Sequence, residues 1–473
     1  MLDTTGFGEA KKVFEFFEEI SKIPHTSTNT EKIADYLVDF AKERSLWYHR
    51  DNANNVIIRK PATPGFENRE AIIFQAHTDM VEDKLPDANI DMKKEGIKIY
   101  RDGDFLKADG TTLGGDDGIG VAYALAILDS SDIPHPEFEA VFTSDEEIGL
   151  LGAGALDTSL LHGKRMINLD SDEEGFFTVG CAGGLGIEIT LPEKTSEAAE
   201  NLYKITVKGL LGGHSGVEIH KPRANAIKII GEFIKNAENA RLARIAGGNA
   251  DNAIPRYAEA TLAFRDEKFI TGKFKDAIIK KYVGIEPEIQ INIEKISDTL
   301  PVFSCEATRG IAEFIDKLPT GVYKMSEDIQ GLVETSSNLG IIKSEGGRVT
   351  LTVSVRSAKN EEKVALRDKI CEIAGSFGAV AHSHGEYPAW EFRKNSALCD
   401  TMKRVYSDMY KKEPVVIIIH AGLECGIFSE KIKDFDCVSI GPCGYDIHTT
   451  DERLSISSTV RVYDYIKNIL KEI

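Results

Sequence analysis

Short apolar segments in the first 170 residues of this chain repeatedly end in a histidine or in acidic residues. Three such junctions are residues 71–76 before His77, residues 138–143 before Asp145, Glu146 and Glu147, and residues 164–169 before Asp170. Their length and their β-branched and aromatic content predict β-strands, and residues 55–59 form a fourth. Because open α/β sheets form their sites at the carboxyl ends of the strands, we expect these polar side chains to meet.

Helical periodicity separates these strands and indicates an α/β sheet covered on both faces. Helices are predicted over residues 10–23, 28–46 and 118–128, the second with Thr28 or Asn29 as its N-cap. After Gly184 the pattern changes to alternating strands with amphipathic helices between them. These strands are predicted at 187–191, 203–207, 258–264, 289–293 and 348–355, and the helices at 224–237, 271–282 and 361–377. A helix at 396–410 and a strand at 415–419 then resume the first pattern.

This order predicts a catalytic domain in two pieces, residues 1–184 and 387–473, with an α+β lid domain inserted at 185–386. The net charge of -19 argues against a nucleic-acid partner, which needs clustered Lys and Arg. No apolar run approaches the roughly 20 residues of a membrane span. The seven scattered cysteines and the amphipathic N-terminal segment, which lacks the features of a signal peptide, favour a cytoplasmic protein.

Each polar cluster has an ordinary structural interpretation when it is taken alone. His77 could be a buried core residue, Asp116 in the stretch LGGDDGIG could be a helix N-cap, and the three acids ending at Glu147 could line a solvated loop. Together with Asp170 and with His448 in a glycine-rich loop, they indicate a metal site. Two histidines and several carboxylates without a thiolate cluster suit zinc or a similar divalent ion.

The order of these motifs resembles that of the co-catalytic dinuclear zinc peptidases, which include aminoacylases and glutamate carboxypeptidases. Within that group the sequence is most similar to the aminoacyl-histidine dipeptidases, also called Xaa-His or cytosol non-specific dipeptidases. The stretches that carry the resemblance are QAHTDM, ADGTTLGGDDGIG, FTSDEEIGLLGA, NLDSDEEG, GGHSGVEIHKPRANA, IHAGLECGIF and HTTDER. They run from residue 75 to residue 453 and so cover nearly the whole chain.

The resemblance implies two metal ions, zinc by default with Mn or Co as substitutes. The implied ligands are His77 and Asp170 for one ion, Glu147 and His448 for the other, and Asp116 as the bridge. It also implies a cis peptide between Asp116 and Asp117. Glu146 would be the general base, and Asp79 would hydrogen-bond His77 and raise its basicity.

The resemblance also implies substrate-binding residues outside the metal cluster. His214 would polarise the scissile carbonyl or stabilise the oxyanion, and Asn252 and Arg356 would bind the terminal carboxylate of the substrate. Gly422 and Glu424 would lie beside the substrate, with Glu424 paired to its free α-amine. His220, His420 and Cys425 are interpreted as packing residues.

The expected activity is metal-dependent hydrolysis of dipeptides with a free amino terminus, by a monomer or a homodimer acting on small peptides. The long insertion favours a site completed within one chain. Two alternatives stay open: an N-acyl-amino-acid deacylase or carboxypeptidase of the same group, and a non-catalytic protein that binds metal or peptide.

Overall fold

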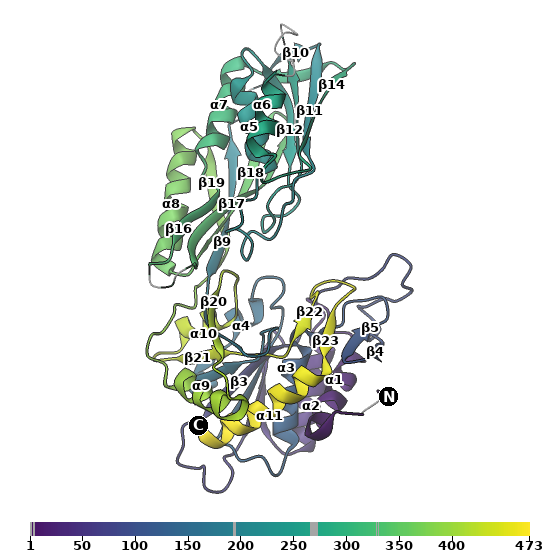
Figure 1. Cartoon of the computed structure of the whole chain (residues 1–473), viewed down its shortest axis with the longest axis vertical. Coiled ribbons are helices and arrows are strands. Elements are labelled where there is room, and N and C mark those ends of the chain that lie inside the picture. The colour runs from purple at the N-terminus through teal and green to yellow at the C-terminus, as the bar shows by residue number, and fades with distance from the viewer. Residues whose placement is uncertain (1, 3–4, 193–194, 265–272, 328, 330) are drawn as a thin grey trace. The chain divides into compact units, whose positions relative to one another are not determined.

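The computed structural model describes residues 2, 5–192, 195–264, 273–327, 329 and 331–473, and it divides into two compact units (Figure 1). The first unit contains the chain up to Cys181 together with Trp390–Ile418 and Leu423–Ile473. The second unit contains Ala182–Ala389 and the short segment Ile419–Gly422. The sequence pattern gives no sign that residues 419–422 belong with the insertion.

The first unit is built on an eight-stranded mixed sheet of order β1-β2-β6-β3-β7-β21-β8-β20. Its strands are β1 (Trp47–Arg50), β2 (Val56–Lys60), β3 (Ile72–His77), β6 (Phe138–Thr143), β7 (Arg165–Asn168), β8 (Phe176–Cys181), β20 (Val415–Ile419) and β21 (Asp436–Ser439). Strand β3 pairs in parallel with β6 on one side and with β7 on the other. The carboxyl ends of these three strands therefore meet at one edge of the sheet.

The central strands of this sheet are buried on both faces. Ile72 and Phe74 pack into a large core shared with helices, whereas Ile73, which points to the opposite face, is equally buried. All six residues of β3 and all six of β6 are buried. This burial confirms the expected α/β class with a mixed sheet covered by helices.

The helices of the first unit are α1 (Lys11–Ser21), α2 (Glu31–Glu43), α3 (Gly115–Asp129), α4 (Leu151–Ala155), α9 (Ala397–Tyr410), α10 (Cys425–Lys431) and α11 (Ile456–Glu472). The N-cap of α2 is Thr30, so the predicted caps Thr28 and Asn29 are wrong by one or two residues. Thr28 instead has a positive φ of 66°, which places it in the turn before the helix.

A small sheet joins the C-terminal region to the segment before α3. It contains β4 (Ile99–Asp102), β5 (Phe105–Ala108), β22 (Gly444–Tyr445) and β23 (Arg453–Ser455). Strand β23 pairs antiparallel with β5, with Leu454 opposite Leu106. This pairing brings β23 and the residue before it, Glu452, next to the glycine-rich loop that opens α3.

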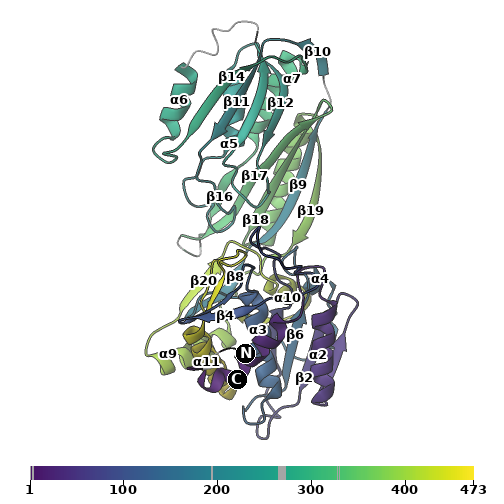
Figure 2. The same ribbon diagram turned by 90° about the vertical axis from the view of Figure 1, so that its right-hand side faces the viewer.

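The second unit is an antiparallel sheet of nine strands with helices α5, α7 and α8 along one side (Figures 1 and 2). Its strands are β9 (Gly183–Leu191), β11 (Leu202–Lys208), β12 (Arg241–Gly247), β13 (Ala258–Ala263), β14 (Gln290–Ile296), β16 (Gly321–Met325), β17 (Val333–Glu345), β18 (Arg348–Ser357) and β19 (Val380–Tyr387). A separate pair is formed by β10 (Thr195–Ala199) and β15 (Leu300–Phe303). The helices are α5 (Ala226–Asn236), α6 (Lys273–Tyr282), α7 (Cys305–Lys317) and α8 (Asn360–Ser376).

The predicted helix at 271–282 corresponds to α6, and its first two residues lie outside the described part of the chain. Helix α7 and the long strand β17 were not predicted from the sequence. Within the described residues, no helix combines the length and the apolar character that crossing a membrane requires.

Candidate metal centre

Strand register brings the first set of polar residues together. His77 is the last residue of β3 and lies opposite Thr143 at the end of β6, so Glu146 and Glu147 follow at the same edge. On the other side of β3, Asp170 follows β7 by two residues. The predicted convergence of strand-end residues is therefore present in the structure.

Asp116 lies between the two histidines of the cluster. Its Oδ1 is 3.0 Å from Nε2 of His77, and its Oδ2 is 3.1 Å from Nε2 of His448. Asp116 and Asp117 have non-helical backbone angles at the start of α3, and the peptide between them is cis, as expected. Asp116 is thus presented outside the helix, with one carboxylate oxygen towards each imidazole.

The donor atoms fall into groups that each could hold a cation. One group is His77, Asp116 and Asp170, and a second is Asp116, Glu147 and His448, with the ligand atoms of each group within 4.8 Å of one another. A third group, His77 with Glu146 and Glu147, overlaps both. The two groups that share Asp116 contain the five residues predicted as ligands.

The hydrogen bonds of His77 test whether these donors suit a metal. Its Nδ1 is 2.9 Å from the main-chain carbonyl of Asp79, so this nitrogen donates, and in the neutral ring the lone pair lies on Nε2. That lone pair faces oxygens of Asp116 and Asp170, at 3.0 and 3.9 Å. A lone pair directed at two carboxylates requires a positive charge between them, so the donor set fits a divalent cation.

The pKa shifts show the same shortage of positive charge. Burial lowers the pKa of His77, but the hydrogen bonds to Asp116 and Asp79 outweigh it and hold that pKa well above its usual range. Hydrogen bonds to Asp116 and Glu147 raise the pKa of His448 to about 10. Burial, followed by the negative charge of Asp116, raises the pKa of Asp170 well above normal. The buried carboxylates therefore need a positive charge beside them, which either added protons or a bound cation can supply.

Glu146 has the environment of a general base. Burial raises its pKa well above the usual value, and the negative charges of Glu424 and Glu147 raise it further, although His77 opposes them. A carboxylate with a raised pKa accepts a proton near neutral pH more readily than an ordinary one does.

Asp79 supports the cluster through its main-chain carbonyl, which contacts His77, and through its carboxylate. Its carboxylate accepts hydrogen bonds from the main-chain N–H of Glu146, at 2.9 Å, and from the Ser27 hydroxyl, at 2.8 Å. The carboxylate oxygen is 3.6 Å from Nδ1 of His77, and it is the Asp79 main-chain carbonyl that accepts from that nitrogen. Asp79 therefore fixes both His77 and the loop that carries Glu146.

Glu424, which was predicted to pair with the substrate amine, lies buried at the base of the cluster. Its side chain is 0% exposed, and its Oε2 accepts from Nε2 of Gln75 at 2.5 Å and from the Thr143 hydroxyl at 2.6 Å. Gln75 in turn accepts from the side-chain amide of Asn168 at 2.6 Å. Glu424 thus connects side chains of the three parallel strands β3, β6 and β7, and its pairing with a substrate amine stays a prediction.

Two further acids were missed by the sequence analysis. Glu452 is buried and accepts from the main-chain N–H groups of Leu113, at 2.7 Å, Gly114, at 3.0 Å, and Gly115, at 2.8 Å. It therefore holds the loop that presents Asp116. Asp117 accepts from the main-chain N–H of His77 at 3.2 Å. The only sequence signal for Glu452 is its place in the stretch HTTDER.

The predicted lid residues all lie in the second unit, where His214, Arg356 and His420 form a cluster. Nδ1 of His214 accepts from the N–H groups of Gly216 and Val217, both at 3.2 Å, so its proton lies on Nε2 as a donor. Nε2 of the buried His420 is 2.7 Å from the Ser336 hydroxyl. Burial, with the charges of Arg356 and His214, lowers the pKa of His420 to about 3.

The other two predicted substrate contacts lie near this cluster. The side chain of Asn252 is exposed, and its main-chain carbonyl accepts from Ser215 at 2.8 Å, which anchors the turn that carries His214. Gly422 packs against the ring of Tyr387.

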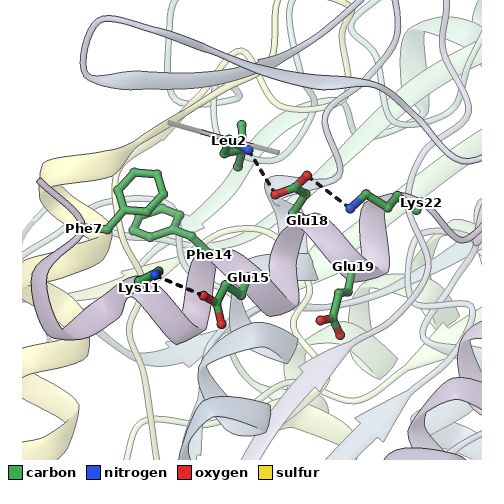
Figure 3. A pocket seen from close by; sticks show the side chains of 8 residues that line it. All are labelled: Leu2, Phe7, Lys11, Phe14, Glu15, Glu18, Glu19 and Lys22. Atoms are coloured by element: carbon green, nitrogen blue, oxygen red, sulfur yellow. Dashed lines mark hydrogen bonds and ion pairs between the residues drawn. The ribbon is translucent and has the colours of Figure 1, made fainter. Parts of the chain in front are cut away.

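A cavity of about 470 Å³ lies along α1 in the first unit, and its lining differs from the metal cluster (Figure 3). Two of the acids there are paired with lysines or with the main chain, and Glu19 accepts from the hydroxyl of Tyr36 at 2.7 Å. Glu15 lies 3.7 Å from Lys11, and Glu18 lies 3.1 Å from Lys22 and accepts from the N–H of Leu2. Because its lining residues include no histidine and no cysteine, it offers no comparable set of metal ligands.

The clustered imidazoles and carboxylates at the strand ends of an α/β unit, with an antiparallel unit inserted, define a metallohydrolase. Comparisons with known proteins narrow this class. The sequence matches the family described as peptidase family M20/M25/M40 over residues 73–472, and the chain belongs to that family.

Two relatives are similar along nearly their whole lengths. The chain is 35% identical to the cytosol non-specific dipeptidase of Escherichia coli (strain K12), over 98% of this chain and 97% of that protein. It is also 35% identical to the aminoacylhistidine dipeptidase of Vibrio alginolyticus, whose crystal structure matches with a TM-score of 0.87 over 98% of this chain and 96% of that one. The aminopeptidase PepT of Bacillus cereus ATCC 10987, at 18% identity and a TM-score of 0.58, shares the fold.

Proposed function

We propose that this chain is a dinuclear metallodipeptidase that hydrolyses dipeptides with a free amino terminus, Xaa-His peptides among them. The observation that carries the proposal is the position of Asp116, with one oxygen 3.0 Å from His77 and the other 3.1 Å from His448. The names of the two relatives at 35% identity support the dipeptide as substrate.

In this proposal Asp116 would be a ligand of both ions, His77 and Asp170 would hold one of them, and Glu147 and His448 would hold the other. Zinc suits this donor set, and Mn or Co could replace it. Two bound divalent ions would lower the pKa of a shared water and polarise the scissile carbonyl.

The remaining steps belong to side chains of the protein. Glu146 takes a proton from the attacking water onto a carboxylate oxygen and delivers it to the nitrogen of the leaving amine. The Nε2–H of His214 donates to the oxygen of the carbonyl under attack. Asn252 and Arg356 bind the terminal carboxylate of the substrate, which suits the fork of donors on a guanidinium. Asp79 holds Glu146 in place, because its carboxylate accepts a hydrogen bond from the main-chain N–H of Glu146.

We place the enzyme in the cytoplasm as a monomer or homodimer. All seven cysteines are free, which suits a reducing compartment, and the E. coli relative is named as a cytosol enzyme.

The test uses metal-stripped protein reloaded stepwise with Zn or Mn, with Ala-His and N-acetyl-Ala-His as paired substrates. We expect Ala-His hydrolysis to reach its maximum at two ions per chain, with little hydrolysis of the blocked peptide. Preference for the acetylated substrate would favour the deacylase alternative. Because Glu424 is buried, it does not by itself distinguish a dipeptidase from a deacylase, and the paired substrates make that distinction. Absence of turnover on a dipeptide panel by the fully loaded protein would favour a binding protein instead.

A further inference from the structure

Arg356 on β18 carries a positive charge that no acidic side chain among the described residues neutralises. Its side chain is half-buried, yet within the described part of the chain it forms no ion pair, and its buried Nε has no hydrogen-bond acceptor. Its Nη1 donates to the hydroxyl of Tyr387 at 2.9 Å. A partly desolvated guanidinium with a neutral partner is suited to an anionic ligand.

Tyr387 reaches Arg356 only because the strand between them carries a glycine there. In the sheet, Gly184 of β9 is paired with Arg356 of β18 on one side and with Tyr387 of β19 on the other. Arg356 and Tyr387 are therefore two strand spacings apart, or roughly 9–10 Å. A Cβ on Gly184 would lie 2.5 Å from Oη of Tyr387 and 2.6 Å from its Cζ, so the phenol lies across the bare backbone of β9.

Further contacts fix the tyrosine in this position. The buried Nζ of Lys363, on α8, donates to the main-chain carbonyl of Tyr387 at 2.6 Å. A Cβ on Gly422 would lie 2.8 Å from Cε2 of the ring. Gly422 therefore leaves room for Tyr387, which gives this predicted substrate contact a different role. Tyr387 is held by its main chain, by both neighbouring glycines and by its hydroxyl.

We propose that Tyr387 is a positioning residue that fixes the guanidinium of Arg356 and thereby sets a preference for substrates with a free C-terminal carboxylate. The inference rests on the proposed function, in which Arg356 binds that carboxylate. A guanidinium held at Nη1 has its remaining N–H donors oriented before the substrate arrives, so less conformational freedom is lost on binding. The nearby His420 is neutral at working pH, which leaves Arg356 as the cation for this purpose.

The test compares Ala-His with its C-terminal amide in the wild type and in Tyr387→Phe, which keeps the ring and removes the hydroxyl. We expect KM for Ala-His to rise roughly tenfold, as for one lost hydrogen bond to a charged group, with kcat unchanged. The amide has no carboxylate, so its kcat/KM should not change. Tyr282→Phe is the matched control. It removes the hydroxyl of a tyrosine on α6 that contacts Glu232.

Gly184→Ala is the second variant, because its new methyl group would displace the Tyr387 hydroxyl. It should reproduce the loss that is selective for the acid substrate. In the Tyr387→Phe background it still meets the ring, but it should add little further acid-selective loss, because the hydroxyl is already absent. An equal loss on acid and amide, or an unchanged KM for the acid, would overturn the positioning role. A wild type that cleaves neither substrate would refute the proposed function itself, whereas normal wild-type turnover with unchanged selectivity in Tyr387→Phe would refute only this inference.

Discussion

Replacement of Glu424 by glutamine should make the metal-free first unit less sensitive to rising pH. Burial raises the pKa of Glu424 from its ordinary 4.5 to about 7, although the hydrogen bonds from Thr143 and Gln75 oppose the shift. Glutamine has nearly the same shape, and its carbonyl oxygen can accept both of these hydrogen bonds. Its amide nitrogen would take the place of Oε1, which has no hydrogen-bond partner.

The sign follows from the direction of the shift. Below pH 4.5 Glu424 is protonated in both the folded and the unfolded chain, and its favourable contribution is fully present. As the pH rises towards 7, the unfolded chain loses this proton while the folded chain keeps it, so folding becomes less favourable. Above the folded pKa the whole loss is reached, about 3 kcal/mol. Glutamine has no such loss.

Urea unfolding of the metal-free protein between pH 5 and pH 8 measures this difference. The two tryptophans, Trp47 and Trp390, both lie in the first unit, so their fluorescence follows that unit alone. The free energy of unfolding of Glu424→Gln minus that of the wild type should increase by about 2.5 kcal/mol from pH 5 to pH 8, because a part of the loss already occurs below pH 5. Glu430→Gln makes the same substitution on an exposed side chain of the same helix and serves as the control.

A difference that stays constant with pH would refute the reasoning, because Glu424 would then not retain its proton on folding. A difference that decreases with pH would show that the charged form is the stabilised one. Either result would mean that Glu424 is ionised at neutral pH and adds its negative charge to those that raise the pKa of Glu146.

Three further substitutions separate the roles within the metal cluster. Glu146→Ala should retain both metals by atomic absorption and lose at least about 100-fold in kcat, as for removal of a general base; retained turnover would exclude that role. Asp116→Ala should lower the content of both metals together, and loss of only one would argue against a bridge. Glu452→Ala removes the acceptor for three main-chain N–H groups before Asp116 and should weaken metal binding about 10–100-fold in chelator competition; unchanged affinity would show that the loop holds its shape without it.

The sequence by itself determined the strands and the residues that follow them. His77 and Asp170 were predicted at one sheet edge because strand length, apolar content and polar termination are local properties of the chain. The acid pair that opens α3 was likewise marked by its glycines. The sharing of His77, Asp116, Glu147, Asp170 and His448 between two ions came from the resemblance, and these roles stay predictions although the structure brings the side chains together.

Only the tertiary structure decided which residues support this cluster. Glu424 lies 349 residues from Gln75 along the chain, and Glu452 lies 339 residues from Leu113, yet each pair is joined by a buried hydrogen bond. The contact of Tyr387 with Arg356 depends on strand register across Gly184. No local periodicity encodes such contacts, because they arise when strands and loops distant in sequence pack together and each buried polar group must find a partner.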